Sequence, residues 1–342
     1  MVFFQINNIF VKNNFNFMKI LGMGNALVDV LARIKDDSLL KQLQLPKGSM
    51  QLIDEEKRAH IFKEIANLEI SMATGGSVSN TCLALAKLGN EAGFIGKVGN
   101  DTYGNFYLKE IKEAGVVAHL SIEDAPSGTA MTLISPDGER TFGTYLGVSA
   151  QLNKDDLDAS IFKNYDYLYL EGYLVQNYEL VEEALKLAKS LKIKIATDLS
   201  SYNVVEDNRE FLLKMIQQYV DIVFANEEEA RALTGKNSEE AIVEIAKMVD
   251  IAIVKIGERG SLIAQGEKTI KVPALKVKML DATAAGDFFT AGFFYGLSQK
   301  VSLEKCAQIG TLLAANVIQT VGTKLPDNNW IQIKSDIKAI IL

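Results

Sequence analysis

The hydrophobic positions of this chain form short apolar runs, separated by longer stretches in which apolar residues recur at helical spacing. The runs are short, as is typical of strands rather than helices. The first set of runs lies at 19–24, 167–170, 193–198, 221–225 and 253–256. Helix-like stretches follow, among them one that ends at Leu88 before Gly89, one at 288–297 and one at 303–320. This alternation predicts a mainly parallel sheet with helices on both faces, and so an α/β fold.

A second set of short apolar or alternating runs interrupts this rhythm, at 28–34, 48–53, 117–123 and 129–134. The turn-forming sequence Ser135-Pro136-Asp137-Gly138 separates the last of them from a further run at 140–146. Hairpins within an α/β pattern predict a small β-sheet that projects from the main domain. We expect its strands to be inserted at about 28–53 and 117–147.

The first 17 residues differ from the rest of the chain. They are rich in Asn and Phe, and they lack the basic start, continuous apolar core and cleavage site of a signal peptide. We expect residues 1–17 to be a disordered leader or a mis-assigned start, with one domain over 18–342. No apolar run reaches membrane-spanning length, which predicts a cytoplasmic protein without a membrane partner.

Composition narrows the chemistry further. Apolar residues make up 48% of the 342 residues, and the net charge of -7 argues against a nucleic-acid partner. The two cysteines, Cys82 and Cys306, give no disulfide framework and no zinc pattern. The two histidines, His60 and His119, are isolated from each other. Acid–base chemistry is therefore expected from carboxylates.

The segment 281–287, Asp-Ala-Thr-Ala-Ala-Gly-Asp, is the strongest candidate for chemistry. If the predicted helix begins here, its first backbone N–H groups are unpaired and carry the positive end of the helix dipole, which together bind phosphate. Ala285 and Gly286 have almost no side chain, so a ligand can approach these groups closely. The Asp287 carboxylate can then accept a proton from an attacking hydroxyl. The same residues also suit an ordinary capped helix, and spacing alone leaves both interpretations open.

Small and polar residues also follow other predicted strands. Asn25 and Asp29 come after the first strand, where parallel sheets hold ligands, although they equally suit a capped turn. Gly75 and Gly76 precede a helix that contains Asn80. The double glycine admits a hydroxylated ligand to the backbone, and the amide of Asn80 can both donate to and accept from a diol. A structural turn explains the glycines as well.

The glycines at Gly22 and Gly24 invite a different interpretation, a dinucleotide-binding oxidoreductase. The third glycine of that pattern is absent, because Leu27 occupies its place. This interpretation predicts nicotinamide binding and remains the weaker one.

Two sequence strings together resemble the signatures of the PfkB, or ribokinase-like, family of sugar and nucleoside kinases. DATAAGDFF is similar to the second signature, with Ala282 in place of the usual Thr, and GGSVSN is similar to the first. The resemblance extends over about residues 19–326. It implies a ribokinase-like three-layer α/β/α fold with a mainly parallel central sheet and a small β-sheet lid that closes over the substrate.

The resemblance assigns roles on the substrate side. It implies that Asp287 is the base, that Ala284, Ala285 and Gly286 form an anion hole, and that the lid arginine, Arg140, reaches the transferred phosphoryl group. Arg140 is otherwise an ordinary surface charge. The residues implied to bind the substrate are Asn25, Asp29, Gly75, Gly76, Asn80 and Glu171. Met50 and Leu52 share one face of a lid strand and are candidates to contact a base or ring, although core packing explains them about as well.

The resemblance also implies ATP and Mg²⁺ as cofactors, and allows K⁺. Asn226 and Glu229 resemble the family's N-x-x-E motif, which binds Mg²⁺ through water. The triple-acid run that contains Glu229 also suits a solvated first helical turn. Further residues implied near the nucleotide are Lys255, which stands where many members have Thr, with Gly257, Gly260, Asn316 and Gly322. The monovalent cation is assigned to Asp281 and Thr283.

We therefore expect a kinase that transfers the γ-phosphoryl group of ATP to a primary hydroxyl of a ribose-containing substrate. The spacing of Asn25 and Asp29 is more similar to adenosine kinases than to ribokinases, which favours adenosine as the acceptor and AMP as the product. A sugar kinase acting on ribose, fructose or 2-keto-3-deoxygluconate would keep the same motifs. A nucleotide-binding regulator without turnover is the alternative from another class. The oligomeric state, monomer or lid-mediated homodimer, stays open.

Overall fold

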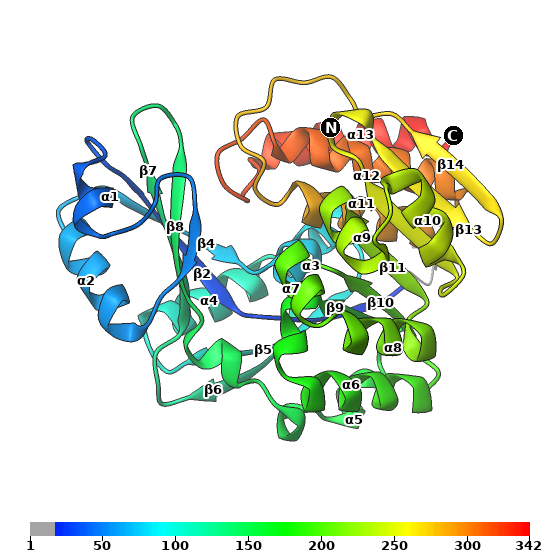
Figure 1. Ribbon diagram of the computed structural model, residues 1–342, viewed down its shortest axis with the longest axis horizontal. Coiled ribbons are helices and arrows are strands. Elements are labelled where there is room, and N and C mark those ends of the chain that lie inside the picture. The colour runs from blue at the N-terminus through cyan, green and yellow to red at the C-terminus, as the bar shows by residue number, and fades with distance from the viewer. Residues whose placement is uncertain (1–17) are drawn as a thin grey trace, which may run out of the picture.

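A large sheet forms the centre of the main domain in the computed structural model, which describes residues 18–342 (Figure 1). The predicted leader at 1–17 lies outside the described residues. Within residues 18–342 this sheet has nine strands in the order β14-β13-β12-β11-β10-β9-β1-β5-β6. Their bounds are β1 Ile20–Met23, β5 Ala92–Gly99, β6 Val117–Glu123, β9 Tyr167–Glu171, β10 Lys194–Asp198, β11 Ile222–Asn226, β12 Ile251–Lys255, β13 Ser261–Gln265 and β14 Lys268–Val272.

The strands from β12 to β6 are parallel, and the hairpin β13–β14 adds an antiparallel edge. The first strand, β1, lies inside the sheet, where Ile20 pairs with Ala92 on one side and with Tyr167 on the other. Strand order therefore reverses beside β1. Ligands of open α/β sheets bind at the carboxyl ends of the strands near such a reversal.

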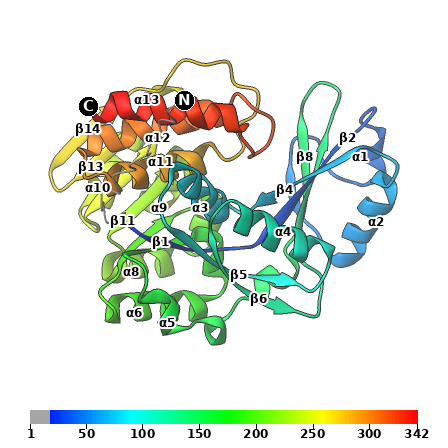
Figure 2. The ribbon, with the colours of Figure 1, turned by 180° about the vertical axis from the view of Figure 1, so that it is seen from behind.

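Helices cover both faces of the sheet and make the predicted three layers (Figure 2). The apolar cluster on one face includes side chains of α3 Ser77–Leu88, α4 Thr102–Glu113, α11 Ala285–Ser298, α12 Leu303–Val317 and α13 Asp327–Ile341. The cluster on the other face includes side chains of α5 Ala159–Phe162, α6 Tyr178–Ser190, α7 Tyr202–Asp207, α8 Arg209–Tyr219, α9 Glu227–Thr234 and α10 Ser238–Ala246. Short 3₁₀ turns are η1 Gly147–Gln151, η2 Lys154–Asp156, η3 Gly172–Gln176 and η4 Gly257–Arg259.

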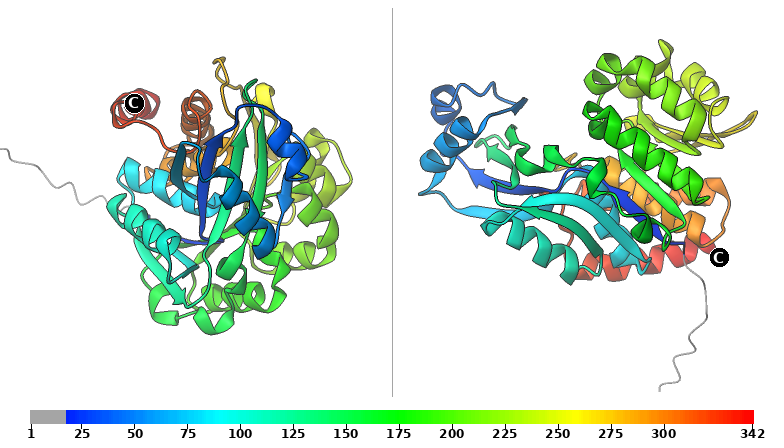
Figure 3. Two further views of the ribbon diagram at one scale, coloured as in Figure 1. Left: turned by 90° about the vertical axis from the view of Figure 1, so that its left-hand side faces the viewer. Right: turned by 90° about the horizontal axis from the view of Figure 1, so that it is seen from below.

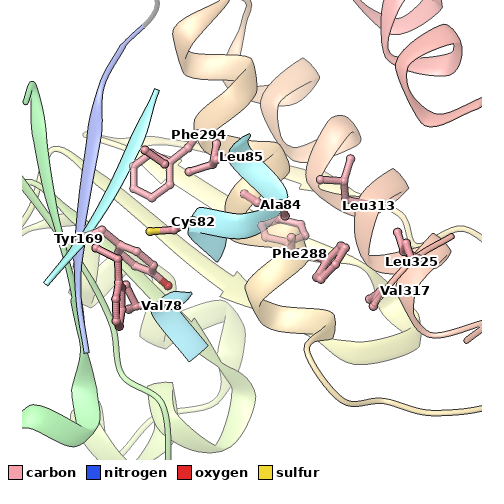
Figure 4. Packing of buried hydrophobic residues seen from close by; sticks show 14 of the residues in the cluster. Val78, Cys82, Ala84, Leu85, Tyr169, Phe288, Phe294, Leu313, Val317 and Leu325 are labelled. Atoms are coloured by element: carbon pink, nitrogen blue, oxygen red, sulfur yellow. The ribbon is translucent and has the colours of Figure 1, made fainter. Parts of the chain in front are cut away.

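Aromatic packing fixes α11 between the sheet and α13, beside apolar side chains of α3 (Figure 4). Tyr169 of β9 meets Phe294 of α11 edge to face, with ring centroids 5.4 Å apart. Phe288, one residue past Asp287, stacks on Trp330 of α13 at 6.0 Å. Contacts of this kind add to the energy of apolar burial. The start of α11 is therefore packed on α13, and its second half is packed on the sheet.

A second sheet projects from the main domain at the side shown left in Figure 1, and Figure 3 shows it from two further directions. We call this sheet, with helices α1 and α2, the lid. Its strand order is β3-β8-β7-β2-β4. The bounds of its elements are β2 Leu27–Arg33, α1 Ser38–Gln42, β3 Met50–Leu52, α2 Glu55–Ile65, β4 Ile70–Gly75, β7 Gly128–Ile134 and β8 Arg140–Tyr145.

The lid differs from the expected one in two of its strands. The run at 117–123 was expected among the lid strands, but it forms β6, which pairs in parallel with β5 at the edge of the large sheet. Helix α4 lies between the two strands, so this is a strand–helix–strand crossover, which favours a parallel neighbour. The lid instead gains β4, whose pairing partner is β2.

Candidate active site

The N-terminus of α11 provides a free set of backbone donors. Ala284 precedes the helix in the left-handed conformation, with φ 62° and no side-chain cap. The Phe288 N–H is the helix donor that reaches the carbonyl of Ala284. Among residues 18–342, no acceptor is found for the N–H groups of Gly286 and Asp287. These donors, at the positive end of a helix dipole, suit a phosphate oxygen.

The carboxylate of Asp287 is held from α3. Ser77 Oγ donates to one carboxylate oxygen at 2.7 Å, and Asn80 Nδ2 donates to the other at 2.9 Å. Burial raises the pKa of Asp287 to about 6, although these two hydrogen bonds oppose the rise. The group is therefore mostly ionised at neutral pH, with a proton affinity higher than that of an exposed aspartate. This combination suits a general base.

Asp281 anchors the loop before α11. One oxygen accepts from Thr283 N at 3.0 Å and Thr283 Oγ1 at 2.7 Å. The other accepts from Gly322 N at 2.7 Å and pairs with Nη1 of Arg140 at 2.7 Å. Arg140 lies at the start of the lid strand β8, so this ion pair joins the lid to the anion-binding loop.

These contacts bear on the expected monovalent cation. A carboxylate offers about four lone-pair positions, and the four donors around Asp281 use all of them. Thr283 Oγ1 is also engaged, because it donates to Asp281 and receives Nη1 of Arg140 at 3.3 Å. The side chains of Asp281 and Thr283 therefore do not fit K⁺ in this arrangement. The guanidinium of Arg140 supplies the positive charge beside Asp281.

Asp29 lies near the Asp287 carboxylate and belongs to the lid. It lies on β2, paired with Ala73 of β4 and Ala130 of β7. Burial and the charge of Asp287 raise the pKa of Asp29 to about 7, and Arg140 opposes the rise. A Cβ on Gly75 would lie 2.3 Å from Asp29 Oδ1, so the glycine is needed for the carboxylate to fit. The structure thus brings Asp29, Gly75 and Asp287 into one site.

Gly76 caps α3 with φ 93°, and a Cβ there would lie 2.2 Å from the carbonyl oxygen of Asn25. Asn25 turns inward rather than outward, because its Nδ2 donates to Glu171 Oε1 at 2.7 Å. Both side chains are buried, and burial raises the pKa of Glu171 to about 7. Glu171 Oε2 has no hydrogen-bond partner in the described residues. Glu171, at the end of β9, thus holds Asn25 in a buried position beside the site.

Met50 and Leu52 resolve one of the alternatives left open by the sequence. They lie on β3, opposite Phe142 and Thr144 of β8, and their exposed fractions are 52% and 60%. Core packing therefore does not explain them. In the pleat of β8, Phe142 and Thr144 share a face with Arg140, which is the face that meets the main domain. The two apolar side chains are free to meet a ligand.

The carboxyl ends of β10, β11 and β12 carry a charged cluster. Asn226 and Glu229 form a reciprocal capping box at the start of α9, in which Asn226 Nδ2 donates to Glu229 Oε1 at 2.7 Å. Burial and the charge of Asp198 raise the pKa of Glu229 to about 7. Lys255 Nζ lies 2.8 Å from Asp198 Oδ2. A Cβ on Gly286 would lie 3.0 Å from the same Nζ, so the cluster adjoins the start of α11.

The remaining residues expected near the nucleotide have more varied settings. Gly257 has φ 57° with open space around its Cα, while Gly260 has φ 99° in the tight turn before β13. Gly322 contacts Asp281 as described above. Asn316 uses its Nδ2 within α12, donating to Leu312 O at 2.9 Å. Gly322 therefore borders the loop before α11, whereas Asn316 has its amide donor engaged in its own helix.

Oxygen donors at these strand ends fit Mg²⁺ in one way. Within residues 18–342, no group of three or more His, Cys, Asp or Glu side chains could enclose a metal ion. Mg²⁺ retains several waters and is usually held by one or two carboxylates together with substrate phosphates. Asn226 and Glu229 suit that role and would hold the ion through its water shell.

Sequence reasoning missed Ser77 as a contributor to the site. Its hydroxyl holds Asp287, and its place directly after Gly75-Gly76 at the start of a helix was the available signal. Asp198 and Lys255 are separated by 57 positions, so their pairing had no local signal.

A family model described as pfkB family carbohydrate kinase matches residues 50–330. The fold is similar to a crystal structure of adenosine kinase from Sinorhizobium meliloti, with a TM-score of 0.83, 31% identity and coverage of 94% of this chain and 99% of that one. It is equally similar to a probable sugar kinase from Rhizobium etli, with a TM-score of 0.83, 32% identity and coverage of 94% and 98%. A ribokinase from Lactococcus lactis is 26% identical, over 85% of this chain and 95% of its own length.

In the part of the chain that the structure describes, no helix is long and apolar enough to cross a membrane.

Proposed function

This chain belongs to the pfkB family of carbohydrate kinases and is a phosphotransferase acting on hydroxyl groups, and we propose that its reaction is the phosphorylation of adenosine by ATP to give AMP. One observation carries the proposal: the Asp287 carboxylate lies at the free N-terminus of α11 with Asp29 of the lid nearby. A base, an anion site and a second carboxylate able to hold hydroxyls therefore meet in one place.

The acceptor is held by its hydroxyl groups. Asp29 accepts hydrogen bonds from a ribose diol, and Asn80, whose Oδ1 has no partner in the described residues, accepts another. Gly75 leaves room for the Asp29 carboxylate, and Gly76 leaves room for the carbonyl of Asn25 at the start of α3. Met50 and Leu52 contact the base. This arrangement directs the primary hydroxyl toward Asp287.

Transfer follows from this placement. Asp287 accepts the proton of the primary hydroxyl while the acceptor oxygen forms its bond to the γ-phosphorus. The bond between that phosphorus and the oxygen bridging to the β-phosphate breaks, and ADP leaves. The N–H groups of Gly286 and Asp287 donate to the phosphoryl oxygens on which charge develops. Arg140, on the lid, adds positive charge at the same place.

Mg²⁺, when bound through water to Asn226 and Glu229, neutralises phosphate charge. The family uses ATP as phosphoryl donor, which suits the anion-binding end of α11. The side chains of this chain bind and orient the acceptor, and Asp287 takes up its proton.

A sugar kinase is the second candidate, because similarity to a probable sugar kinase and to a ribokinase accompanies the similarity to an adenosine kinase. Such an enzyme would use the same Asp29 and Asp287. The two candidates differ in what the exposed side chains of Met50 and Leu52 meet: a purine base in one case and nothing as large in the other.

The test is ATP consumption by the purified protein with Mg²⁺, with adenosine, other nucleosides, ribose, fructose or 2-keto-3-deoxygluconate as acceptor. Adenosine turnover far above that of the sugars supports the proposal, and turnover with one sugar alone replaces it with the second candidate. If no acceptor is phosphorylated while ATP still binds, the chain is a nucleotide-binding regulator.

The role of Asp287 is tested separately with Asp287→Asn. We expect turnover to fall on the order of 10²-fold or more, the usual scale for loss of a general base, with nucleotide binding retained. Near-normal turnover in this variant would remove Asp287 from the role of base.

A further inference from the structure

Lys255 and Asp198 form an ion pair at the carboxyl ends of two strands of the parallel sheet. Asp198 ends β10 and Lys255 ends β12, with β11 between them. The Nζ–Oδ2 distance is 2.8 Å, and the side chains are only 18% and 8% exposed. An ion pair this well shielded from water loses much hydration, so stability alone is a weak reason for it. Its position indicates another role.

The ammonium group lies next to the anion-binding end of α11. A Cβ placed on Gly286 would be 3.0 Å from Nζ, whereas the glycine leaves that space open. An ammonium has three N–H donors. In residues 18–342 its single hydrogen-bond acceptor is Asp198, which leaves two donors for a ligand. These donors and the Gly286 N–H adjoin the same space.

The surrounding charges are otherwise negative. Burial alone lowers the pKa of Lys255, but the charges of Asp198, Glu229 and Asp287 raise it overall. The group is therefore a cation at neutral pH. A triphosphate that enters this end of the sheet faces three carboxylates, which repel it, and Lys255, which attracts it.

We propose that Lys255 donates directly to the transferred γ-phosphoryl group and that Asp198 is a positioning residue that holds the ammonium beside Gly286. This rests on the proposed kinase function, and it adds a fixed side-chain cation to the anion hole. As the acceptor oxygen bonds to the γ-phosphorus and the bond to the bridging oxygen breaks, the proton of the acceptor passes to Asp287. Lys255 keeps its own proton throughout and offsets the charge on the phosphoryl oxygens.

The test compares Lys255→Met with the double variant Lys255→Met/Asp198→Asn. The single change leaves Asp198 buried without its partner, and the double change removes that cost. Lys194→Met is the matched control. Lys194 also pairs with carboxylates, Asp221 at 2.6 Å and Asp250 at 3.0 Å, but at the opposite, amino-terminal ends of the same strands.

The first readout is equilibrium binding of ATP, ADP and AMP to each purified full-length protein. We expect both Lys255 variants to bind ATP about ten- to a hundredfold more weakly, the scale for a lost hydrogen bond to a charged group, with ADP affinity nearly unchanged because ADP lacks the γ-phosphoryl group. Lys194→Met should match the native protein. Equal weakening of ATP and ADP, or recovery of ATP affinity in the double variant, would show a structural pair and overturn the inference.

The second readout, kcat together with ATP affinity, distinguishes the positioning role of Asp198 from the direct phosphate contact of Lys255. Asp198→Asn keeps the ammonium but loosens its placement, so we expect ATP affinity to be kept or improved while kcat falls by about tenfold or more. A loss of ATP affinity equal to that of Lys255→Met would contradict the division of roles. If the native protein binds none of the three nucleotides, the proposed function fails with it. If the native protein and the Lys255 variants bind ATP equally well, only this inference fails.

Discussion

Two carboxyl groups, Asp29 and Asp287, lie in the proposed reaction site, and both are harder to ionise than an exposed aspartate. Burial raises the pKa of both, to about 7 for Asp29 and about 6 for Asp287, and the charge of Asp287 adds to the rise at Asp29. The donors Ser77 and Asn80 hold Asp287 nearer to its ionised form. Proton affinity at this site is therefore set by a few side chains from α3, α11 and the lid.

This predicts an acid limb in the pH profile of kcat/KM. A base must be unprotonated, so activity is lost as pH falls through the pKa of Asp287, near 6. The groups that face it are Ser77, Asn80, Asp198 and Lys255, of which Asp198 raises the pKa and Lys255 lowers it. Measurement of kcat/KM from pH 5 to 9 tests this. A profile that stays flat down to pH 5 would contradict it.

The ionised carboxylate of Asp287 is also predicted to lower the free energy of unfolding. Its folded pKa lies above the ordinary value, so the folded state binds the proton more tightly than the unfolded chain does. The free energy of unfolding therefore falls as pH rises from about 4 to 6, and the loss persists at neutral pH. We expect Asp287→Asn to raise the melting temperature by a few degrees at pH 7.5 and by less at pH 4.5, measured by calorimetry. An unchanged difference at the two pH values would contradict the assignment.

At the scale of elements, the loop before α11 decides where the anion hole lies. Asp281 fixes one end through its four donors, and Phe288 and Trp330 fix the other. Between them Ala284 adopts a left-handed backbone, which is unfavourable for a residue with a Cβ. The structure therefore keeps local strain next to the proposed phosphate site.

Replacing Ala284 with Gly should relieve that strain. We expect the free energy of unfolding to rise by about 0.5–1 kcal/mol, because the relief exceeds the added freedom of the unfolded chain. Ala285→Gly is the control: Ala285 is helical, so the same change one residue later should destabilise. Urea unfolding of both variants measures this, and destabilisation of equal size in both would contradict it.

The sequence predicted most of the elements, because short apolar runs and glycine-bounded helices are local signals. It placed β1, β9 to β12 and the helix at 288–297 close to their observed bounds. It assigned 117–123 to the lid, because a strand run does not reveal its partner. The contacts of Arg140 with Asp281 and of Lys255 with Asp198 join residues far apart in the chain, and only the fold brings them together.

At the scale of the whole molecule, two of the contacts between the lid and the main domain involve an arginine. One is the pair of Arg140 and Asp281 above the anion hole. The other is Arg58 of α2, whose guanidinium lies 5.1–5.4 Å from the ring centroids of Phe62, Tyr103 and Tyr145. Tyr103 belongs to α4 of the main domain, and the other two rings belong to the lid. Cation–π contacts thus join α2 of the lid to α4 of the main domain.

We expect Arg58→Ala to loosen the lid without touching the nucleotide. Loss of these contacts, worth roughly 1–2 kcal/mol, should raise the KM of the acceptor about five- to thirtyfold and leave ATP affinity near the native value. Amide hydrogen exchange in α2 should become faster. An equal loss of affinity for ATP would place the effect elsewhere. Lys63→Ala, an exposed cation on the same helix, is the control.

The inner position of β1 has a consequence for biosynthesis. This strand is made first, yet one of its two neighbours in the sheet, β9, lies at Tyr167–Glu171. At typical synthesis rates of roughly 5–20 residues per second, that partner follows on the order of ten seconds later. Until then the nascent chain exposes an apolar strand with one edge unpaired. We therefore expect fragments that end before β9 to aggregate rather than fold.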